Sequence, residues 1–299
     1  MGDAMAGGLG LAGELTQTSR FELRYLPVPE ALAHHVTTFY HFVCDEPKIR
    51  EIQPAAVGQL TIFPRGTGAI HFRDGKVAPS HETNLLSPFS VAAPFVVDGP
   101  FHAVGAALTP LGWAELTGLH AGEHSNRFEQ AGELLGKNVD ELGAQLCAAY
   151  RRGAMDGPAC AEALGDWIAA NLTPLAPGHR QLIAQTAAWL GGDLNPDIEE
   201  LFAASAYSRR QTQRLVDRFF GLSPTTLRRK YRALRAAGLF SQPDLSPELE
   251  AAVRECFYDQ PHLIREIRLF AGRTPARLSD DPDSYLTEML DLRNLREIG

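Results

Sequence analysis

The feature that most constrains the fold of this chain is a change in hydrophobic period near Pro110. Before it, apolar residues stand in short or alternating runs, as in residues 36–43 and 103–108, and turn-forming stretches such as 73–75 (Arg-Asp-Gly) divide the runs. After it, Ala- and Leu-rich segments repeat with helical period. The sequence therefore predicts an α+β protein, with an N-terminal antiparallel β domain followed by helices and a C-terminal all-α domain.

The domain boundaries follow from length and from breaks in the pattern. A chain of 299 residues that is 44% hydrophobic suffices for about two domains. Residues 1–19 lack a sustained apolar period and predict a flexible tail, and the stretch 173–178 (TPLAPG) predicts a linker because its prolines cannot continue a helix. We therefore expect a β domain with a helical connector at 20–178, a helical domain at 179–278 and an acidic C-terminal tail at 279–299.

The cysteine spacing and the N-terminal sequence indicate the cellular compartment of the protein. The four cysteines are scattered without a CxxC pair, which favours neither a zinc site nor a disulfide framework. The N-terminus has no basic segment before its short apolar stretch, and no run of about 18 apolar residues occurs in the sequence. The sequence predicts a cytoplasmic protein without a membrane partner, a metal or another cofactor.

Charge is distributed unevenly along the chain. The net charge is −8, but residues 201–278 carry 14 Lys and Arg against 7 Asp and Glu, whereas the rest of the chain carries 14 against 29. A basic segment within an acidic protein is favourable where phosphates must be approached, because each cation at a phosphate releases condensed counterions. The alternative is a solvated arginine-rich surface without a ligand.

A helix-turn-helix pattern lies within this basic segment. One apolar helix ends near Tyr207, and Ser208 with Gln211 forms an S-x-x-Q capping box that begins the next. The core face of that second helix consists of Thr212, Leu215, Val216 and Phe219, at i, i+3, i+4 and i+7. Its other positions include Arg209, Arg210, Gln213 and Arg214. Arginine suits guanine and glutamine suits adenine in the major groove.

A second unit of the same kind follows at residues 248–272. Asp259 is positioned to cap a helix whose core residues are Leu263, Ile267 and Phe270 and whose polar residues include Gln260 and Arg265. Between the two units, Ser223 and Pro224 begin a helix rich in arginine. Such a helix, with about 1.5 Å rise per residue, separates the two units by roughly one turn of DNA.

At residues 180–278 the sequence resembles the AraC/XylS family of bacterial transcription regulators. The motifs that carry the resemblance are FGLSP at 220–224, RKYRALR at 229–235, FYDQPHLIR at 257–265 and GRTP at 272–275, in this order. The resemblance implies two helix-turn-helix units that read adjacent major-groove segments. Five positions depart from the family's usual residues, namely Thr212, Val216, Arg254, Glu255 and Cys256.

Roles follow from the resemblance position by position. It implies DNA contact by Arg210, Gln213 and Arg214 in the first unit, and Arg209 precedes them at the start of the same helix. In the second unit it implies DNA contact by Gln260, Pro261, Ile264 and Arg265. It further implies a DNA-binding domain at 179–278 and a nucleoid-associated protein that is not an enzyme.

The N-terminal half resembles an uncharacterised AraC-associated domain at residues 25–30 (YLPVPE) and 105–112 (GAALTPLG). That resemblance implies a small antiparallel β-barrel, cupin-like and flanked by helices, that serves as a sensor or dimerisation domain and whose mouth could hold a small ligand. The implied partners are double-stranded DNA, an unidentified small-molecule effector, RNA polymerase and a second copy of the chain.

Two other functions compete with this interpretation. A cupin-like enzyme would need converging metal ligands, and His71 and His81-Glu82 do not reproduce the H-x-H pattern with a nearby Glu. A regulator that binds a protein partner and has lost DNA contact would fit the acidic overall charge.

Overall fold

The computed structural model describes residues 21–280, 284–291 and 295. The predicted tail at 1–19 lies outside the described residues. The N-terminal strands are β1 (Phe21–Leu26), β2 (Val36–Cys44), β3 (Lys48–Gln53), β4 (Gln59–His71), β5 (Val77–Pro79), β6 (Thr83–Leu86), β7 (Ala93–Leu108) and β8 (Phe128–Gln130). The first helices are a 3-10 turn η2 (Glu30–Leu32), α1 (Pro110–Thr117), α2 (Ala131–Leu135), α3 (Lys137–Arg151) and α4 (Gly157–Asn171).

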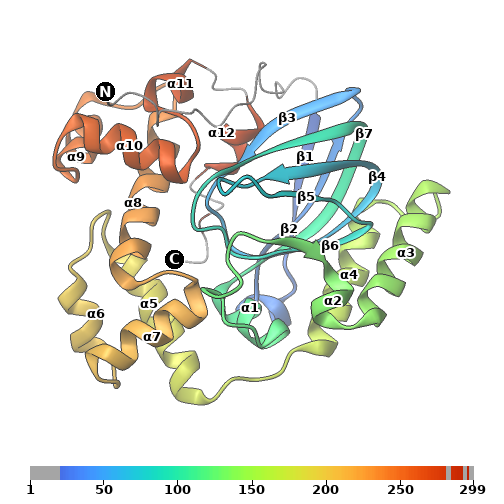
Figure 1. Cartoon of the computed structure of the whole chain (residues 1–299), viewed down its shortest axis with the longest axis horizontal. Helices are drawn as coiled ribbons and strands as arrows, with labels where there is room; N and C mark the ends of the chain where they lie inside the picture. Colours follow the sequence, from blue (N-terminus) through green and yellow to red (C-terminus); the bar gives the residue numbers. More distant parts are fainter. Residues whose placement is uncertain (1–20, 281–283, 292–294, 296–299) are drawn as a thin grey trace.

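All of these strands belong to one antiparallel sheet, in which the 16-residue strand β7 pairs with β2, β3 and β4. The strand order is β1-β2-β7-β4-β6-β8, with β3 and β5 off this path. The sheet is curved (Figure 1), its concave face lines a hollow of about 70 Å³, and the pairings among the described residues leave the sheet open at β1 and β8. The predicted α+β class, with an antiparallel N-terminal sheet and a helical C-terminal part, is confirmed.

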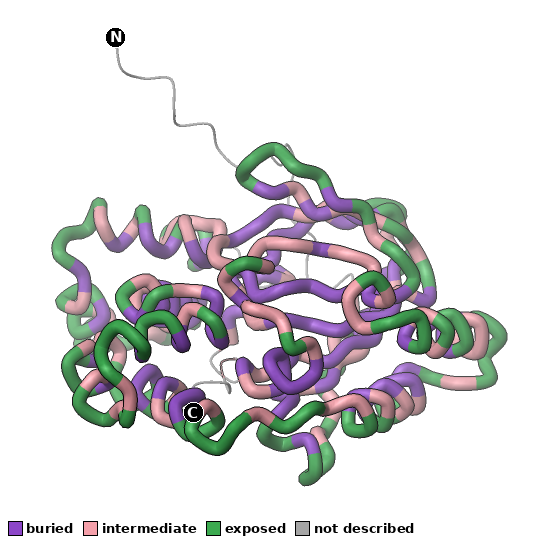
Figure 2. The backbone as a smooth tube through the Cα atoms, turned by 60° about the horizontal axis from the view of Figure 1, so that its bottom comes forward, coloured by how far each residue is buried: buried purple, intermediate pink, exposed green. Residues whose placement is uncertain are grey.

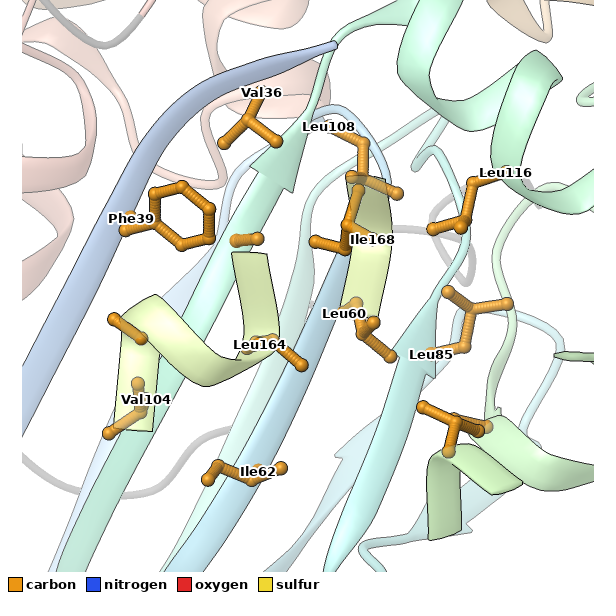
Figure 3. Packing of buried hydrophobic residues seen from close by; sticks show 14 of the residues in the cluster. Val36, Phe39, Leu60, Ile62, Leu85, Val104, Leu108, Leu116, Leu164 and Ile168 are labelled. Carbon is orange, nitrogen blue, oxygen red and sulfur yellow. The ribbon is translucent and has the colours of Figure 1, made fainter. Parts of the chain in front are cut away.

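The two faces of the sheet bury different residues because side chains alternate along each strand. Leu60 and Ile62 of β4 lie on the outer face, where Leu164 and Ile168 of α4 cover them (Figure 3). Thr61 and Phe63 of the same strand lie on the inner, concave face. The outer face is thus an ordinary sheet-helix core, whereas the inner face encloses the hollow.

The C-terminal part consists of α5 (Pro177–Gly192), α6 (Ile198–Ala204), α7 (Arg209–Phe220), α8 (Pro224–Phe240), α9 (Pro247–Glu255), α10 (Gln260–Phe270), α11 (Pro275–Ser279) and α12 (Tyr285–Met289). Residues 173–176 of the predicted interruption at 173–178 lie between α4 and α5, whereas Pro177 and Gly178 already form the start of α5. Figure 2 shows how the exposed residues of these helices alternate with buried ones. None of the helices in the described part has both the length and the apolarity to cross a membrane.

The buried carboxylate of Glu115 in α1 joins the two halves. It lies 2.9 Å from His35 Nε2, accepts a hydrogen bond of 2.9 Å from the backbone N–H of Leu175, and lies 3.3 Å from Arg180 Nε of α5. The backbone carbonyl of Glu115 also accepts from the N–H of Thr173. One side chain that is 3% exposed therefore holds the segment between α4 and α5 in place.

Replacing this carboxylate should destabilise the protein more than removing its exposed partner. We expect Glu115→Ala to lower the free energy of unfolding by about 3 kcal/mol, because buried hydrogen-bonding groups lose their partner. Arg180→Ala is the matched control, and since that side chain is 42% exposed its loss should cost less than about 1 kcal/mol. Chemical denaturation of both variants measures the difference, and equal costs would show that Glu115 is not the joining group.

Candidate nucleic-acid interface

The first helix-turn-helix unit is formed by α6 and α7. Ser208 is the N-cap of α7, and the Ser208–Gln211 capping box predicted from the sequence is present. Thr212, Leu215, Val216 and Phe219 are buried, as the periodicity indicates. The helix ends at Gly221, whose φ of +81° is the left-handed conformation that glycine adopts without strain.

Two of the residues that depart from the AraC/XylS pattern, Thr212 and Val216, lie in this unit and are buried. Thr212 is fully buried, and its hydroxyl lies 2.8 Å from the hydroxyl of Ser205 in the turn between the helices. A polar side chain replaces the usual apolar one here, but it is satisfied by a hydrogen bond across the turn. Val216 is also fully buried, so the smaller side chain still belongs to the core.

The α7 residues that the sequence predicts to contact DNA differ in their surroundings. Arg210, Gln213 and Arg214 are exposed and make no hydrogen bond or ion pair with any residue that the structure describes. Arg209 is exposed too, but it pairs with Glu199 of α6 and lies 4.2 Å from the ring centre of Phe202. Arg209 therefore contributes to holding α6 against α7, whereas the other three are available to a ligand.

The second unit is formed by α9 and α10. Asp259 caps α10 by accepting a 2.7 Å hydrogen bond from the N–H of His262. Cys256, which stands where the family usually has glycine, has φ −72° and ψ −7°. This is the right-handed region that any residue adopts, so the cysteine introduces no backbone strain.

The α10 residues that the sequence predicts to contact DNA also differ in exposure. Gln260, Pro261 and Arg265 are exposed. Ile264 is partly buried and packs against the apolar cluster of this unit. Three of the four therefore face solvent, and Ile264 lies at the border between the core and the exposed face.

The cations of the connecting helix α8 have protein partners, which the sequence did not indicate. Arg228 donates to the carbonyl of Pro196, Arg235 donates to the carbonyls of Leu190 and Asp193, and Lys230 donates to the carbonyls of Ala56 and Phe89. Arg229 and Arg232 pair with Glu266. The basic charge of α8 is used inside the protein, so the free cations concentrate on α7 and α10.

The Glu266 carboxylate fixes α10 on α8. It is 2% exposed and accepts hydrogen bonds of 2.6 Å from Arg229 and 2.7 Å from Arg232, while His262 Nε2 lies 3.4 Å away. Burial alone would raise the pKa of Glu266, but the hydrogen bonds from Arg232 and Arg229 hold it below its usual range. Arg232 also bonds Asn195 and the carbonyl of Cys256, so one guanidinium joins three segments.

The N-terminal half contacts the C-terminal end of each reading helix, α7 and α10. The backbone N–H of Ala121 donates to the carbonyl of Arg218 in α7, at 2.7 Å. The N–H groups of Ala55 and Ala92 donate to Phe270 and Leu269 of α10, at 2.8 and 3.0 Å. The last carbonyls of a helix lack partners within it, and here the sheet domain supplies them.

The alternative chemistries, a metal site or a nucleophilic thiol, would involve histidine and cysteine side chains. Within the described ranges, no three His, Cys, Asp or Glu side chains gather as metal ligands would. His41 and His102 both hydrogen-bond the Tyr150 hydroxyl, at 2.9 and 2.7 Å. Burial raises the pKa of Cys147 to about 12 and that of Cys160 to about 11, so both thiols stay protonated at neutral pH and are poor nucleophiles.

Comparison with known proteins gives weak similarities. The sequence matches no protein-family description and no curated protein. Among solved structures, ToxT from Vibrio cholerae O395 bound to (E)-4-(8-methylnaphthalen-1-yl)but-3-enoic acid has TM-score 0.44 and 8% identity, over 88% of this chain and 99% of that one. ToxT from strain SCE256 with bound unsaturated fatty acid has TM-score 0.42 and 7% identity, over 90% and 98%. The AraC-like transcriptional activator CuxR has TM-score 0.29 and 16% identity, over 73% and 86%.

The Glu266 cluster generates a prediction about acid stability. We expect Glu266→Gln to lower the free energy of unfolding at neutral pH by about 3 kcal/mol, because it leaves buried arginine charge uncompensated. Since the folded-state pKa is lowered, the wild-type contribution is present above the ordinary carboxyl pKa of 4.5 and is lost as pH falls through the lowered value. Urea denaturation at several pH values measures both.

The control for this prediction is Glu250→Gln. Glu250 pairs with Arg254 on the same helix, and its side chain is 41% exposed, so its loss should cost less than about 1 kcal/mol. If Glu266→Gln were no more costly than this control, the buried pair would not fix α10.

Proposed function

We propose that this chain is a sequence-specific DNA-binding transcription regulator of the AraC type. The observation that carries the proposal is the pair of helix-turn-helix units at the two ends of α8 (Figure 1), each with exposed arginine and glutamine among the first six residues of its second helix, α7 or α10. The 17 residues of α8 span about 25 Å, which is of the same order as one DNA turn of about 34 Å.

The residues take distinct roles in this proposal. Arg210 and Arg214 of α7 and Arg265 of α10 read guanine or contact phosphates, and Gln213 and Gln260 read adenine. The exposure of these side chains and their lack of partners among the described residues support these roles. Arg209 has a smaller part, since its pairing with Glu199 must be given up before it can contact DNA.

The N-terminal sheet is the sensor in this proposal. Its concave face holds a cavity of about 70 Å³ lined by aromatic side chains and by Gln53 and Thr61. A small apolar effector in this cavity would act on DNA affinity through the hydrogen bonds between the sheet domain and the ends of α7 and α10. Contact with RNA polymerase, pairing with a second copy and location at the nucleoid complete the proposal, and no catalytic step is part of it.

Substitution of the reading arginines tests the DNA interface. We expect Arg210→Ala and Arg265→Ala each to weaken specific binding to the chain's own promoter region by about 5- to 150-fold, or about 1 to 3 kcal/mol. Arg209→Ala should weaken it less. Fluorescence anisotropy at several salt concentrations gives the affinities, and loss of a phosphate contact also lowers the slope of affinity against salt.

Arg152→Ala is the matched control, because that arginine is equally exposed but lies at the end of α3, in the N-terminal half. Affinities of Arg210→Ala and Arg265→Ala that equal those of the control would reject the assignment. If the wild-type chain shows no salt-dependent DNA binding at all, a regulator that binds a protein partner is the better interpretation.

A further inference from the structure

The short helix α12 is shared between the two halves of the molecule. It lies beside the sheet and the C-terminal helices (Figure 1), and its N-cap Ser284 accepts from the N–H of Thr287. Tyr285 packs with the aromatic residues of the concave face, whereas its neighbour Leu286 and the later Leu290 are buried in the cluster that contains α8 and α10. Adjacent residues of one helix therefore belong to two different cores.

The Tyr285 ring sits in an aromatic site on the concave face. Its centre is 5.4 Å from that of Phe42 at an interplanar angle of 82°, and 5.9 Å from that of Phe95 at 90°. Phe21 lies edge-on at 5.7 Å. These are the edge-to-face distances that stabilise aromatic pairs. Burial, with smaller contributions from Tyr40, Tyr25 and Glu51, raises the pKa of Tyr285 well above its usual value, so its hydroxyl is neutral.

This aromatic site is incompletely filled. The cavity of about 70 Å³ adjoins the Tyr285 ring and is lined by Gln53 and Thr61, which are 5% and 1% exposed. Gln53 Nε2 and Thr61 Oγ1 have no hydrogen-bond partner among the described residues. A buried polar atom without a partner is costly, and such atoms commonly mark the place of a ligand or a water.

We propose that α12 is an internal ligand of the sheet domain, and that a neutral, phenol-like aromatic molecule competes with Tyr285 for the same site. A phenol would take the edge-to-face contacts of the tyrosine ring and extend a hydroxyl toward Gln53 and Thr61. An anion is disfavoured, because the carboxylate of Glu51 is fully buried on the same strand face as Gln53. The proposal rests on the proposed function, in which this cavity is the sensor site.

Displacement of Tyr285 has a consequence for the second reading unit. Because Ser284 to Leu290 form one continuous segment, moving Tyr285 out of the sheet disturbs Leu286 and Leu290 in the cluster with Leu263 and Phe270 of α10. The aromatic ligand and the packing of α10 are thus coupled through α12. Coupling of this kind requires that the ligand bind the displaced state more tightly than the docked one.

The test uses 4-methylphenol, which reproduces the tyrosine side chain, and the full-length Tyr285→Ala variant. The substitution removes the internal competitor and leaves a ring-sized cavity, and apolar cavities of this kind bind small aromatic molecules. We expect 4-methylphenol to raise the Tm of the variant in a concentration-dependent way. The wild type should require at least about tenfold more 4-methylphenol, because its site is open for only a fraction of the time.

Two controls and a second variant make the test decisive. Tyr258→Ala removes a tyrosine that is 93% exposed, so its response to 4-methylphenol should equal that of the wild type. The anion 4-methylbenzoate should bind Tyr285→Ala at least about tenfold more weakly than 4-methylphenol. Ser284→Ala removes the cap of α12 while keeping the ring, and should lower the half-saturating 4-methylphenol concentration by about fivefold relative to the wild type.

The outcomes are separable from those of the DNA experiment. An unchanged Tm of Tyr285→Ala with 4-methylphenol, or equal responses of Tyr285→Ala and Tyr258→Ala, overturns the proposal. Tighter binding of 4-methylbenzoate overturns the ligand class. If Tyr285→Ala does not fold, Ser284→Ala decides, and a half-saturating concentration equal to that of the wild type rejects the internal ligand. None of these readouts uses DNA, so failure of wild-type DNA binding would count against the regulator function alone.

Discussion

The orientation of α10 depends on a buried carboxylate, Glu266, which accepts from two arginines of α8. Such a cluster contributes little net stability, because the desolvation of its charges offsets their attraction. The cluster instead favours one geometry, because a packing of α10 on α8 that separated Glu266 from these arginines would leave a buried charge uncompensated. The cluster therefore favours the observed orientation of α10, and the proposed role of α10 at base edges would require such a fixed orientation.

The connecting helix α8 shows that part of the positive charge of residues 201–278 is paired within the protein. The cations of α8 neutralise Glu266 or donate to carbonyls, as Arg235 does at Leu190 and Asp193 near the end of α5. The C-terminal end of a helix carries partial negative charge, so a cation at the end of α5 is favourable. The basic surplus counted over residues 201–278 thus overstates the charge available to phosphates, and what remains free on α7 and α10 matters more for salt-dependent binding.

Local signals explain what could be predicted from the sequence. The caps Ser208 and Asp259 and the buried face of α7 depend on residues within one helix, so periodicity and spacing were sufficient. Lys230 could not be placed, because its partners at Ala56 and Phe89 are far away in the sequence. The surface on which Tyr285 packs could not be predicted either, since a five-residue helix carries too short a pattern to show what it packs against.

Backbone hydrogen bonds at the ends of α7 and α10 join the sheet domain to both helices. The N–H groups of Ala121, Ala55 and Ala92 reach the last turns of the two reading helices, so a shift in the sheet moves carbonyl partners at both. Gly272 follows α10 with φ +90°, and a Cβ there would lie 2.5 Å from Ile52 Cγ2 of β3, which shows how closely the halves approach. Closely packed interiors transmit displacement, so this contact and the three backbone hydrogen bonds are the places where a movement of the sheet domain would reach α7 and α10.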